Sequence, residues 1–423
     1  MNKKLILRLP PKSKILVYTQ ILWVLTMLWF RDVAGLPSMV SYLTDVIMVS
    51  ASLLNINRIR RNVRWVNTKL QSKIVLAMLI CIVIGIVLNL VNPLLVIWAA
   101  RNNFRFYIFF YICVGVLCVE DIDKILSLLK KFFWANVVMC TYQYFVLDLS
   151  GDHLGGFFGI VEGCNAFMNI LLCCTCANIF AEYGAKKINF GKLMRYLGFS
   201  LYIAVLSELK VFYVECVLMI MVFTLCLKPS MKTVLLCTIS ILAGVFLVLI
   251  LAQIDPHTLS ILIDERAWLT YLAGNGYTKS GDLNRLTAIS QIQSRFFSGS
   301  FLRTMFGFGF GSCETSKFDF LNSAFFQRYG YLHYRWFTHA WIFLEQGAIG
   351  LSLLIFFFLS ILKTLFRMKN SIRPDLVLTA TLFVSTCILG MIYNCALQLE
   401  ITYVIAFMIS IPFVLKKQMA IKG

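Results

Sequence analysis

The stretch Trp336-Phe-Thr-His-Ala-Trp-Ile-Phe-Leu-Glu-Gln-Gly-Ala-Ile-Gly350 marks the point where a long polar segment, residues 254–338, turns into an apolar run. The whole chain shares the character of that run, since 60% of its 423 residues are hydrophobic, 14% are charged and the mean hydropathy is +0.80. Such values exclude a soluble globular protein and are typical of a polytopic membrane protein. His339 is therefore expected at a boundary between water and membrane, where a substrate with a polar head and a lipid anchor can be held at both ends.

Apolar segments long enough to cross a hydrocarbon core of about 30 Å recur along the chain. They predict an all-α integral membrane protein with twelve transmembrane helices, which forms a single membrane domain over residues 1–423. One large extracytoplasmic loop, residues 254–338, is expected between the ninth and tenth helices and should contain short helices. The predicted helices cover residues 15–31, 34–54, 74–91, 104–120, 132–149, 164–182, 191–207, 211–227, 233–253, 339–361, 375–393 and 399–415.

The distribution of basic residues predicts the orientation, because lysine and arginine resist translocation and gather in cytoplasmic loops. Most of the 39 Lys and Arg residues lie in segments that are cytoplasmic if both termini are inside. An even number of helices fits that arrangement. The net charge of +19 is then explained by topology and by attraction to anionic lipids, so it does not indicate nucleic-acid binding.

The sequence motifs indicate neither metal nor nucleotide chemistry. His333 and His339 have no third histidine or cysteine nearby, so no zinc site is expected. The chain has no HExxH sequence, no P-loop and no dinucleotide fingerprint. We therefore expect a reaction that needs no cofactor.

Arg285 lies in an amphipathic segment, residues 281–297, where Asp282 is expected to cap a helix. A guanidinium on the apolar face of that helix needs an anion or a set of carbonyl groups to offset its desolvation. Arg285 is expected either to bind a diphosphate, or to pair with an acid such as Glu208, or to reach lipid headgroups. The apolar side chains that share its face at helical spacing are Leu286, Ile289, Ile292 and Phe296.

Gly307, Gly309 and Gly311 alternate with phenylalanines later in the same loop. Glycine permits positive φ and close approach of the backbone, so a row of exposed N–H groups here can bind an oxyanion. An ordinary surface loop is compatible with the same alternation, and the pattern taken alone favours it.

Ionisable residues also meet at a predicted helix junction on the outer face. Glu208 and Lys210 lie between two short helices, and Glu215 lies about 7 Å deeper if its helix runs straight. Ionisable groups at such depth usually serve a pathway or a binding site. The alternative is an interfacial ion pair between Glu208 and Lys210, which contributes little stability.

These features together resemble the O-antigen polymerase and ligase family of bacterial membrane glycosyltransferases. The segment from His339 through Glu345 and Gly347 is similar to that family's histidine-containing helix start and to the acidic-x-glycine sequence that follows it. The alternating glycines at 307–311 are similar to its glycine motif, and Arg285 to its upstream arginine.

The capsular-polysaccharide polymerase branch of the family is similar at two further places, residues 155–165, which end at Asn165, and residues 208–210. Lys210 stands where many family members carry an arginine. Because lysine is a point charge without the bidentate fork of a guanidinium, this departure bears on how phosphate would be bound.

The resemblance implies transfer of a glycan from undecaprenyl diphosphate to a sugar hydroxyl of a second lipid-linked repeat unit, at the extracytoplasmic face of the bacterial plasma membrane. Arg285 and Lys210 are then expected to bind the diphosphate and to stabilise charge on the leaving oxygen without a metal. His339 is expected to remove the acceptor proton, with inversion at the reacting carbon. The further residues expected to bind substrate are Asn165, Glu208, Glu215, Arg303, Gly307, Gly309, Gly311 and Arg335.

The expected partners are the undecaprenyl-diphosphate-linked oligosaccharide, the lipid bilayer, and a flippase and a chain-length regulator of the same pathway. Three alternatives stay open. A ligase of the same family would pass finished glycan to another acceptor, a flippase or transporter would move lipid-linked sugars, and a scaffold would have no chemistry. The transporter is disfavoured because the sequence has no related halves and gathers its polar residues on one face.

Overall fold

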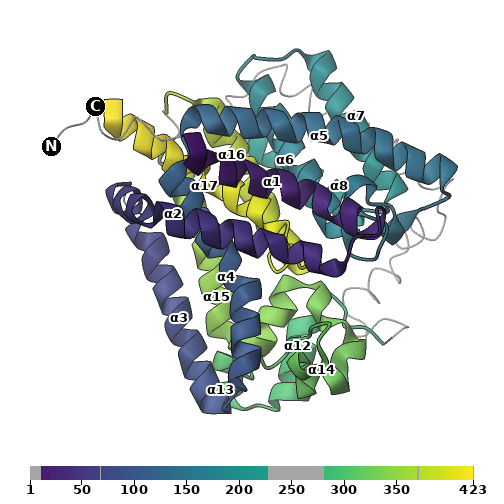
Figure 1. Cartoon of the computed structure of the whole chain (residues 1–423), viewed down its shortest axis with the longest axis vertical. Helices are drawn as coiled ribbons and strands as arrows, with labels where there is room; N and C mark the ends of the chain where they lie inside the picture. The colour runs from purple at the N-terminus through teal and green to yellow at the C-terminus, as the bar shows by residue number, and fades with distance from the viewer. Residues whose placement is uncertain (1–10, 67, 227–280, 369–370, 423) are drawn as a thin grey trace.

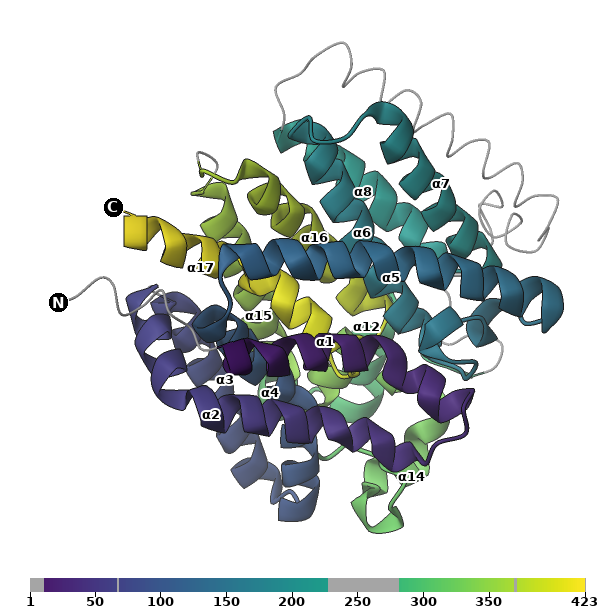
Figure 2. The same cartoon turned by 45° about the horizontal axis from the view of Figure 1, so that its top comes forward.

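The computed structural model describes residues 11–66, 68–226, 281–368 and 371–422. Within these ranges the chain folds into helices joined by short turns (Figure 1, Figure 2). The helix predicted at 233–253 and residues 254–280 of the predicted loop lie outside the described residues. The described part is thus all-α, as the apolar sequence predicts.

Up to residue 226 the described chain forms eight long helices. A short 3-10 turn, η2 (Ser38–Tyr42), leads into the second of them, and η3 (Gly151–His153) and η4 (Gly156–Phe158) precede the sixth. The helices are α1 (Pro11–Asp32), α2 (Leu43–Trp65), α3 (Lys69–Asn89), α4 (Pro93–Val116), α5 (Val119–Val146), α6 (Cys164–Gly184), α7 (Phe190–Leu206) and α8 (Lys210–Cys226).

From residue 281 onward, short helices come first and three long helices follow. The long helices are α15 (Thr338–Phe366), α16 (Pro374–Tyr393) and α17 (Thr402–Lys422). The short elements gather at one end of the molecule beside α15 (Figure 1). They are α12 (Ala288–Ile292), the π-helical turn η5 (Gln293–Phe297), α13 (Phe301–Phe306), η6 (Asp319–Leu321), α14 (Ala324–Tyr329), η7 (Gly330–Leu332) and η8 (Tyr334–Trp336).

The helix expected at 104–120 begins eleven residues earlier than predicted, at Pro93. The side-chain oxygen of Asn92 accepts a hydrogen bond from the backbone N–H of Leu94 at 2.9 Å, and proline occupies the first helical position. Both are standard helix-start signals. Hydropathy alone misplaced the boundary because Arg101, Asn102 and Asn103 lie within the helix, directly before the predicted start.

The helix expected at 34–54 is also displaced, because it begins at Leu43 and runs on to Trp65. Gly35 has a φ of +72° and Pro37 follows it, so the chain turns there before the helix can start. The arginines of the α2 end are good helix formers, which allows the helix to continue beyond its apolar part.

By length and hydropathy, five helical segments of the described residues can cross a membrane. This supports a membrane-embedded protein, while the count of twelve spans and the cytoplasmic termini stay predictions. The start of α1 and the end of α17 point toward the same side in both views (Figure 1, Figure 2). The five segments are Ser38–Arg64, Lys69–Asn89, Cys164–Gly184, Thr338–Phe366 and Pro374–Tyr393.

Helices α16 and α17 form the centre of the bundle. α16 packs against α6, α8, α15 and α17, and α17 also packs against α4. Side chains are buried at every position from 401 to 415, so α17 is apolar all round, as a central helix must be. By contrast, α3 lies at the edge and exposes side chains such as Leu76, Ile80 and Val83.

α15 is interrupted at Gly347, whose φ of +63° and ψ of −162° are not helical. We call residues 338–346 the head of α15. All side chains of the head are buried, and its first residues carry the candidate histidine.

Candidate functional site

His339 lies in the first turn of α15 and is 7% exposed. Its Nε2 lies 2.8 Å from the carbonyl oxygen of Arg285, and its Nδ1 lies 3.2 Å from the carbonyl oxygen of Met391. A neutral imidazole can donate only one of these hydrogen bonds, whereas an imidazolium can donate both. The ring therefore bridges the described part of the loop to the end of α16.

Arg285 is half-buried, and its guanidinium stacks on aromatic side chains. Its Cζ lies 5.1 Å from the ring centroid of Phe337 and 4.4 Å from that of Tyr393, and its Nε donates to the carbonyl oxygen of Tyr393 at 3.3 Å. Stacking on a ring fixes the plane of a guanidinium and directs its N–H groups along the edge. Phe337 and His339 flank Thr338, so the ring on which Arg285 stacks lies on the same turn of backbone as the histidine.

The start of α15 is held by the segment between α16 and α17. The backbone N–H and the hydroxyl of Thr338 both donate to the carbonyl oxygen of Asn394 at 3.0 Å, and the same hydroxyl lies 2.9 Å from Oε1 of Gln398. These bonds satisfy groups that a helix start leaves without intrahelical partners. The position of His339 is thus determined by residues 391–398 as much as by α15 itself.

A small cavity of about 10 Å³, close to the size needed for one water molecule, adjoins this junction. Its walls include Glu215, Thr338, Gly390, Met391 and Asn394, so it lies directly beside the residues that hold His339. The cavity therefore joins a carboxyl group of α8 to the junction of α15 and α16.

Glu215 is 1% exposed, and two side chains of α6 hold its carboxyl group. Asn169 Nδ2 donates to its Oε1 at 3.2 Å, and the thiol of Cys173 donates to its Oε2 at 3.1 Å. A Cβ on Gly390 would lie 3.6 Å from Oε1, an ordinary van der Waals distance, so the carboxyl group of α8 packs against α16 at this position. Burial and hydrogen bonding of this kind give a carboxyl group a fixed orientation.

Lys210 is at the first position of α8 and is exposed, and Glu208 just before it has a φ of +50°. The two ring nitrogens of His339 contact Met391 and Arg285, and Lys210 is neither of these partners nor part of the cavity lining. The carboxylate of Glu208 instead faces Gly151, where a Cβ would lie 3.0 Å from Oε1. The structure brings Arg285, His339 and Glu215 to one region but does not bring Lys210 into contact with them.

The glycines at 307, 309 and 311 serve close packing of backbones. A Cβ on Gly307 would lie 2.5 Å from the carbonyl oxygen of Leu344, and a Cβ on Gly347 would lie 2.4 Å from that of Met305. The N–H of Phe308 donates to the Leu344 carbonyl at 2.8 Å, across the interruption of α15. Gly309 likewise abuts α3, and Gly311 abuts α4, so the described contacts explain these glycines without an external oxyanion.

A buried acidic pair follows these glycines. The backbone N–H of Cys313 donates to Oε1 of Glu345 at 3.0 Å, so an internal carboxylate accepts from this loop. Glu314 is fully buried, where Asn102 donates to its Oε2 at 3.2 Å and Arg335 Nη2 lies 3.7 Å away. Burial raises the pKa of Glu314, and Arg335 partly opposes that shift.

Ion pairs of α4 extend this polar region. Arg101 pairs with Asp45 at 2.7 Å, and Arg105 pairs with Glu400 at 3.0 Å. Their partners come from α2 and from the segment before α17, far away in sequence. The sequence did not predict these carboxylate partners, because only the fold brings them close to the arginines.

The remaining predicted site residues are spread over other surfaces. Asn165 donates to the carboxylate of Asp152 at the start of α6, and Arg303 is exposed on α13 with its Cζ 5.4 Å from the Phe308 ring. Arg335 stacks on Trp341 at 4.1 Å. No described contact joins these residues to His339.

The predicted helix cap at Asp282 is wrong. The described helix begins at Ala288, and the Asp282 carboxylate contacts the His333 ring instead. Leu286 is 48% exposed, while Ile292 and Phe296 are buried, so the expected apolar face is only partly realised. A turn at residues 285–287, rather than a helix, presents Arg285 to the head of α15.

Among the described residues, no group of three His, Cys, Asp or Glu side chains is arranged to hold a metal ion. No protein-family model matches the chain, and no curated protein matches it significantly.

Proposed function

We propose that this chain is a bacterial membrane glycosyltransferase that polymerises undecaprenyl-diphosphate-linked oligosaccharides at the extracytoplasmic face of the plasma membrane. The observation that supports the proposal is the contact of the His339 ring with the backbone carbonyl of Arg285 at 2.8 Å, where the polar loop meets α15. The guanidinium of Arg285, a group suited to phosphate, stacks on Phe337, two residues before the proton acceptor His339. The carboxyl group of Glu215 lines a small cavity beside the same junction.

In this proposal an acceptor hydroxyl attacks the anomeric carbon of the donor sugar. The new carbon–oxygen bond forms as the bond to the diphosphate oxygen breaks, and the leaving diphosphate takes the electron pair. Arg285 stabilises the charge that develops on this oxygen, and His339 receives the hydroxyl proton. Attack opposite to the leaving group inverts the configuration.

This role places a demand on His339. Its Nε2 faces the Arg285 carbonyl, so an acceptor hydroxyl must replace that carbonyl before the nitrogen can take a proton. Binding of the diphosphate by Arg285 supplies a reason for residue 285 to shift. Binding of the lipid-linked donor would then expose Nε2 of His339 to the acceptor hydroxyl.

Lys210 enters the proposal as a second diphosphate ligand. It is exposed at the start of α8, one helix turn and a half from Glu215. The other proposed substrate contacts have less structural support than Arg285 and His339. They are Asn165, Glu208, Glu215, Arg303, Arg335 and the glycine segment 307–311. A ligase would use the same chemistry on a different acceptor.

The test is reconstitution of the full chain in proteoliposomes with lipid-linked repeat units and no nucleotide. We expect a ladder of carrier-linked polymers, which His339→Ala abolishes while the matched variant of an exposed histidine, His153→Ala, retains it. Transfer of glycan only to an acceptor other than a repeat unit would identify a ligase. Absence of any glycan transfer by the intact chain, or full activity of His339→Ala, would overturn the proposal.

A further inference from the structure

The described part of the predicted loop lies beside the end of α3, against which α13 packs (Figure 1). A Cβ on Gly85 would lie 3.2 Å from the carbonyl oxygen of Phe306, and Nδ2 of Asn89 donates to the carbonyl oxygen of Gly307 at 3.4 Å. Gly85 is four residues before Asn89, the last residue of α3, and four residues of helix rise by about 6 Å. The end of α13 is therefore level with the last turn of α3.

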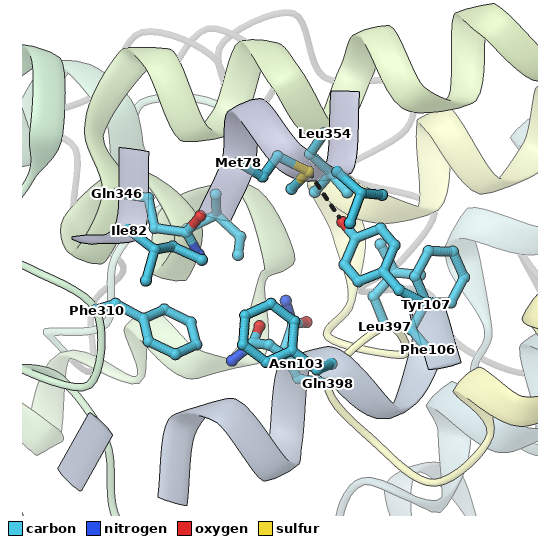
Figure 3. Close-up of a pocket in the computed structure, with 13 residues that line it drawn as sticks. Met78, Ile82, Asn103, Phe106, Tyr107, Phe310, Gln346, Leu354, Leu397 and Gln398 are labelled. Atoms are coloured by element: carbon cyan, nitrogen blue, oxygen red, sulfur yellow. Dashed lines mark hydrogen bonds between the residues drawn. The ribbon is translucent and has the colours of Figure 1, made fainter. Parts of the chain in front are cut away.

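Phe310 reaches further along α3. Its side chain is fully buried and packs in one apolar cluster with Ile82 of α3 and Ala99 of α4 (Figure 3). Ile82 is seven residues before Asn89, which corresponds to about 10 Å along the helix axis. A space of about 30 Å³, enough for one or two water molecules, remains beside the Phe310 ring. This part of the loop is thus anchored between the helices.

The α3 helix is long and apolar enough to cross a membrane. Its 21 residues rise by about 31 Å, which matches the thickness of a hydrocarbon core. It exposes Ile80, Val83 and Val87 along its length, and the turn after it exposes Leu90. Because the exposed apolar side of α3 extends to its end, the elements that pack on its last turns lie where hydrocarbon meets headgroups.

The first turn of α13 is exposed at this level. Phe301 is 71% exposed and Leu302 is 54% exposed, whereas the hydroxyl of Thr304 accepts a hydrogen bond from Gln293 of η5 at 2.8 Å. The short helix is thus held to the rest of the loop and still presents two apolar side chains outward. Contiguous exposed apolar side chains mark a surface that lipid or protein covers.

A second exposed pair lies on η6, which packs against α4. Phe318 is 42% exposed and Phe320 is 67% exposed, and their ring centroids are 5.8 Å apart. The indole N–H of Trp98, in the second turn of α4, donates to the carbonyl oxygen of Thr315 at 3.1 Å and holds this segment near the turn between α3 and α4. We call the two exposed pairs the loop rim, which comprises Phe301, Leu302, Phe318 and Phe320.

Charged side chains next to the loop rim suit phosphate groups. Arg303 of α13 and Lys317 before η6 are exposed, and their long stems allow the charges to reach headgroups above an apolar surface. Asp319 is exposed between Phe318 and Phe320. Because successive side chains of a 3-10 turn are about 120° apart, Asp319 can face water while both rings face lipid.

The surroundings of the loop rim favour a bilayer over a protein partner. The rim adjoins the exposed side chains of α3 and of the turn that follows it, such as Leu90 and Leu94. A bilayer that surrounds α3 therefore reaches the level of the rim as well. Aromatic side chains, which form most of the rim, are enriched where hydrocarbon meets headgroups.

We propose that the loop rim inserts into the leaflet that surrounds the end of α3, and that Arg303 binds phospholipid phosphate groups there. The partner is thus a phospholipid surface. Insertion fixes the height of the loop relative to the bilayer, and it is independent of the proposed glycosyl transfer.

The test uses the purified full chain in proteoliposomes of phosphatidylcholine and phosphatidylglycerol, with p-benzoylphenylalanine in place of Phe301 or Phe320. After irradiation, mass spectrometry measures lipid adducts. The same photoprobe at Ile80, on the exposed side of α3, gives the reference for contact with acyl chains. Tyr331 is the matched control, because it is an aromatic residue of the loop that is 54% exposed but belongs to η7, which packs on α14 away from α3 (Figure 1, Figure 2).

We expect adducts at positions 301 and 320 at a level comparable to that at position 80 and about tenfold above that at position 331, as contact with acyl chains requires. Adduct yields at 301 and 320 no higher than at 331 would overturn the proposal. Crosslinks from these positions to a second copy of the chain, in place of lipid, would also overturn it, because they would identify a protein interface.

Two further variants, each combined with the photoprobe at position 301, test how the rim is held. Arg303→Gln should lower the ratio of phosphatidylglycerol to phosphatidylcholine adducts about fivefold, the effect of one basic residue at an anionic surface. Arg195→Gln, at an exposed position on α7, should leave that ratio unchanged. Leu302→Glu should reduce all lipid adducts at position 301, while the photoprobe at position 80 in the same variant still reports an intact α3. An unchanged ratio in Arg303→Gln would contradict phosphate binding, and unchanged adducts in Leu302→Glu would contradict insertion.

Discussion

The imidazole of His339 and the backbone carbonyl of Arg285 are 2.8 Å apart, so the two residues are coupled directly through the main chain. A displacement of residue 285 changes the hydrogen bonding of the His339 ring. A change in the protonation of that ring in turn alters the hydrogen bond that keeps residue 285 in place. A substitution at either residue is therefore expected to affect the position of the other.

Substitution of His339 by glutamine distinguishes two possible roles of the histidine, namely accepting a proton and positioning Arg285. The carboxamide NH₂ of glutamine can still donate to a carbonyl, but it cannot take a proton at neutral pH. If His339 is the base, His339→Gln and His339→Ala should both lose about 10²- to 10⁴-fold in transfer rate. The rate of the unsubstituted chain should rise with pH through one ionisation that both variants lack. Substantial activity of His339→Gln with the same pH profile would instead assign a positioning role.

Arg285→Lys keeps the charge but loses the planar fork and the stacking on Phe337 and Tyr393. We expect a loss of about 10- to 100-fold in kcat/KM for the lipid-linked donor, the effect of one or two charge-assisted hydrogen bonds. Initial rates at varied donor concentration measure it. Arg195→Lys, at an exposed position on α7, is the control and should retain the original rate. An unchanged kcat/KM in Arg285→Lys would rule out a specific phosphate contact.

Gly347→Ala should destabilise the fold through steric overlap of the new Cβ with neighbouring backbone, in addition to strain from its positive φ. The added Cβ would lie 2.4 Å from the carbonyl carbon and oxygen of Met305, and neither atom can move without shifting α13. We expect a loss of about 2–4 kcal/mol in unfolding free energy. Gly299→Ala is the control for strain alone, because Gly299 has a φ of +76° but no atom within 4 Å of a Cβ. Thermal unfolding of both variants in the same detergent measures the difference. Equal Tm shifts for Gly347→Ala and Gly299→Ala would contradict a close approach of the backbones at Gly347 and Met305.

Glu314→Gln should alter the pH dependence of stability. Because burial raises the pKa of Glu314 above its ordinary value of 4.5, the folded state binds its proton more tightly than the unfolded state does. The stability that this provides is present at low pH and is lost as pH rises from about 4.5 through the folded-state pKa. As pH rises over that interval, the Tm of Glu314→Gln should therefore increase relative to the Tm of the unsubstituted chain. Glu162→Gln, at an exposed position, should show no such trend.

The helical character of the chain was predictable because apolar composition and segment length report directly on burial and span. Boundaries were less accurate where hydropathy and local signals disagree. Asn92 and Pro93 mark the start of α4 clearly, yet the charged residues that follow concealed it. Those charges are tolerated because Asp45 and Glu400 neutralise the arginines, a tertiary property that no local pattern contains.

The candidate site was predictable only in part. His339 and Arg285 were both identified from motifs, and the fold places them in contact. The buried Glu314 was not identified, since a single glutamate in a polar loop has no sequence feature that indicates burial. The role of Gly307 and Gly347 was also hidden, because the close crossing of two backbones depends on how separate segments pack.

The interruption of α15 at Gly347 has a mechanical consequence. In a continuous helix, unbroken backbone hydrogen bonds would connect its membrane part to its first turn, but the non-helical residue 347 interrupts them. The position of the histidine then depends on its contacts with residues 285 and 391 and on the backbone crossing at Met305, more than on the remainder of α15. A change in the tilt of the membrane part of α15 should therefore reach the histidine only through α13.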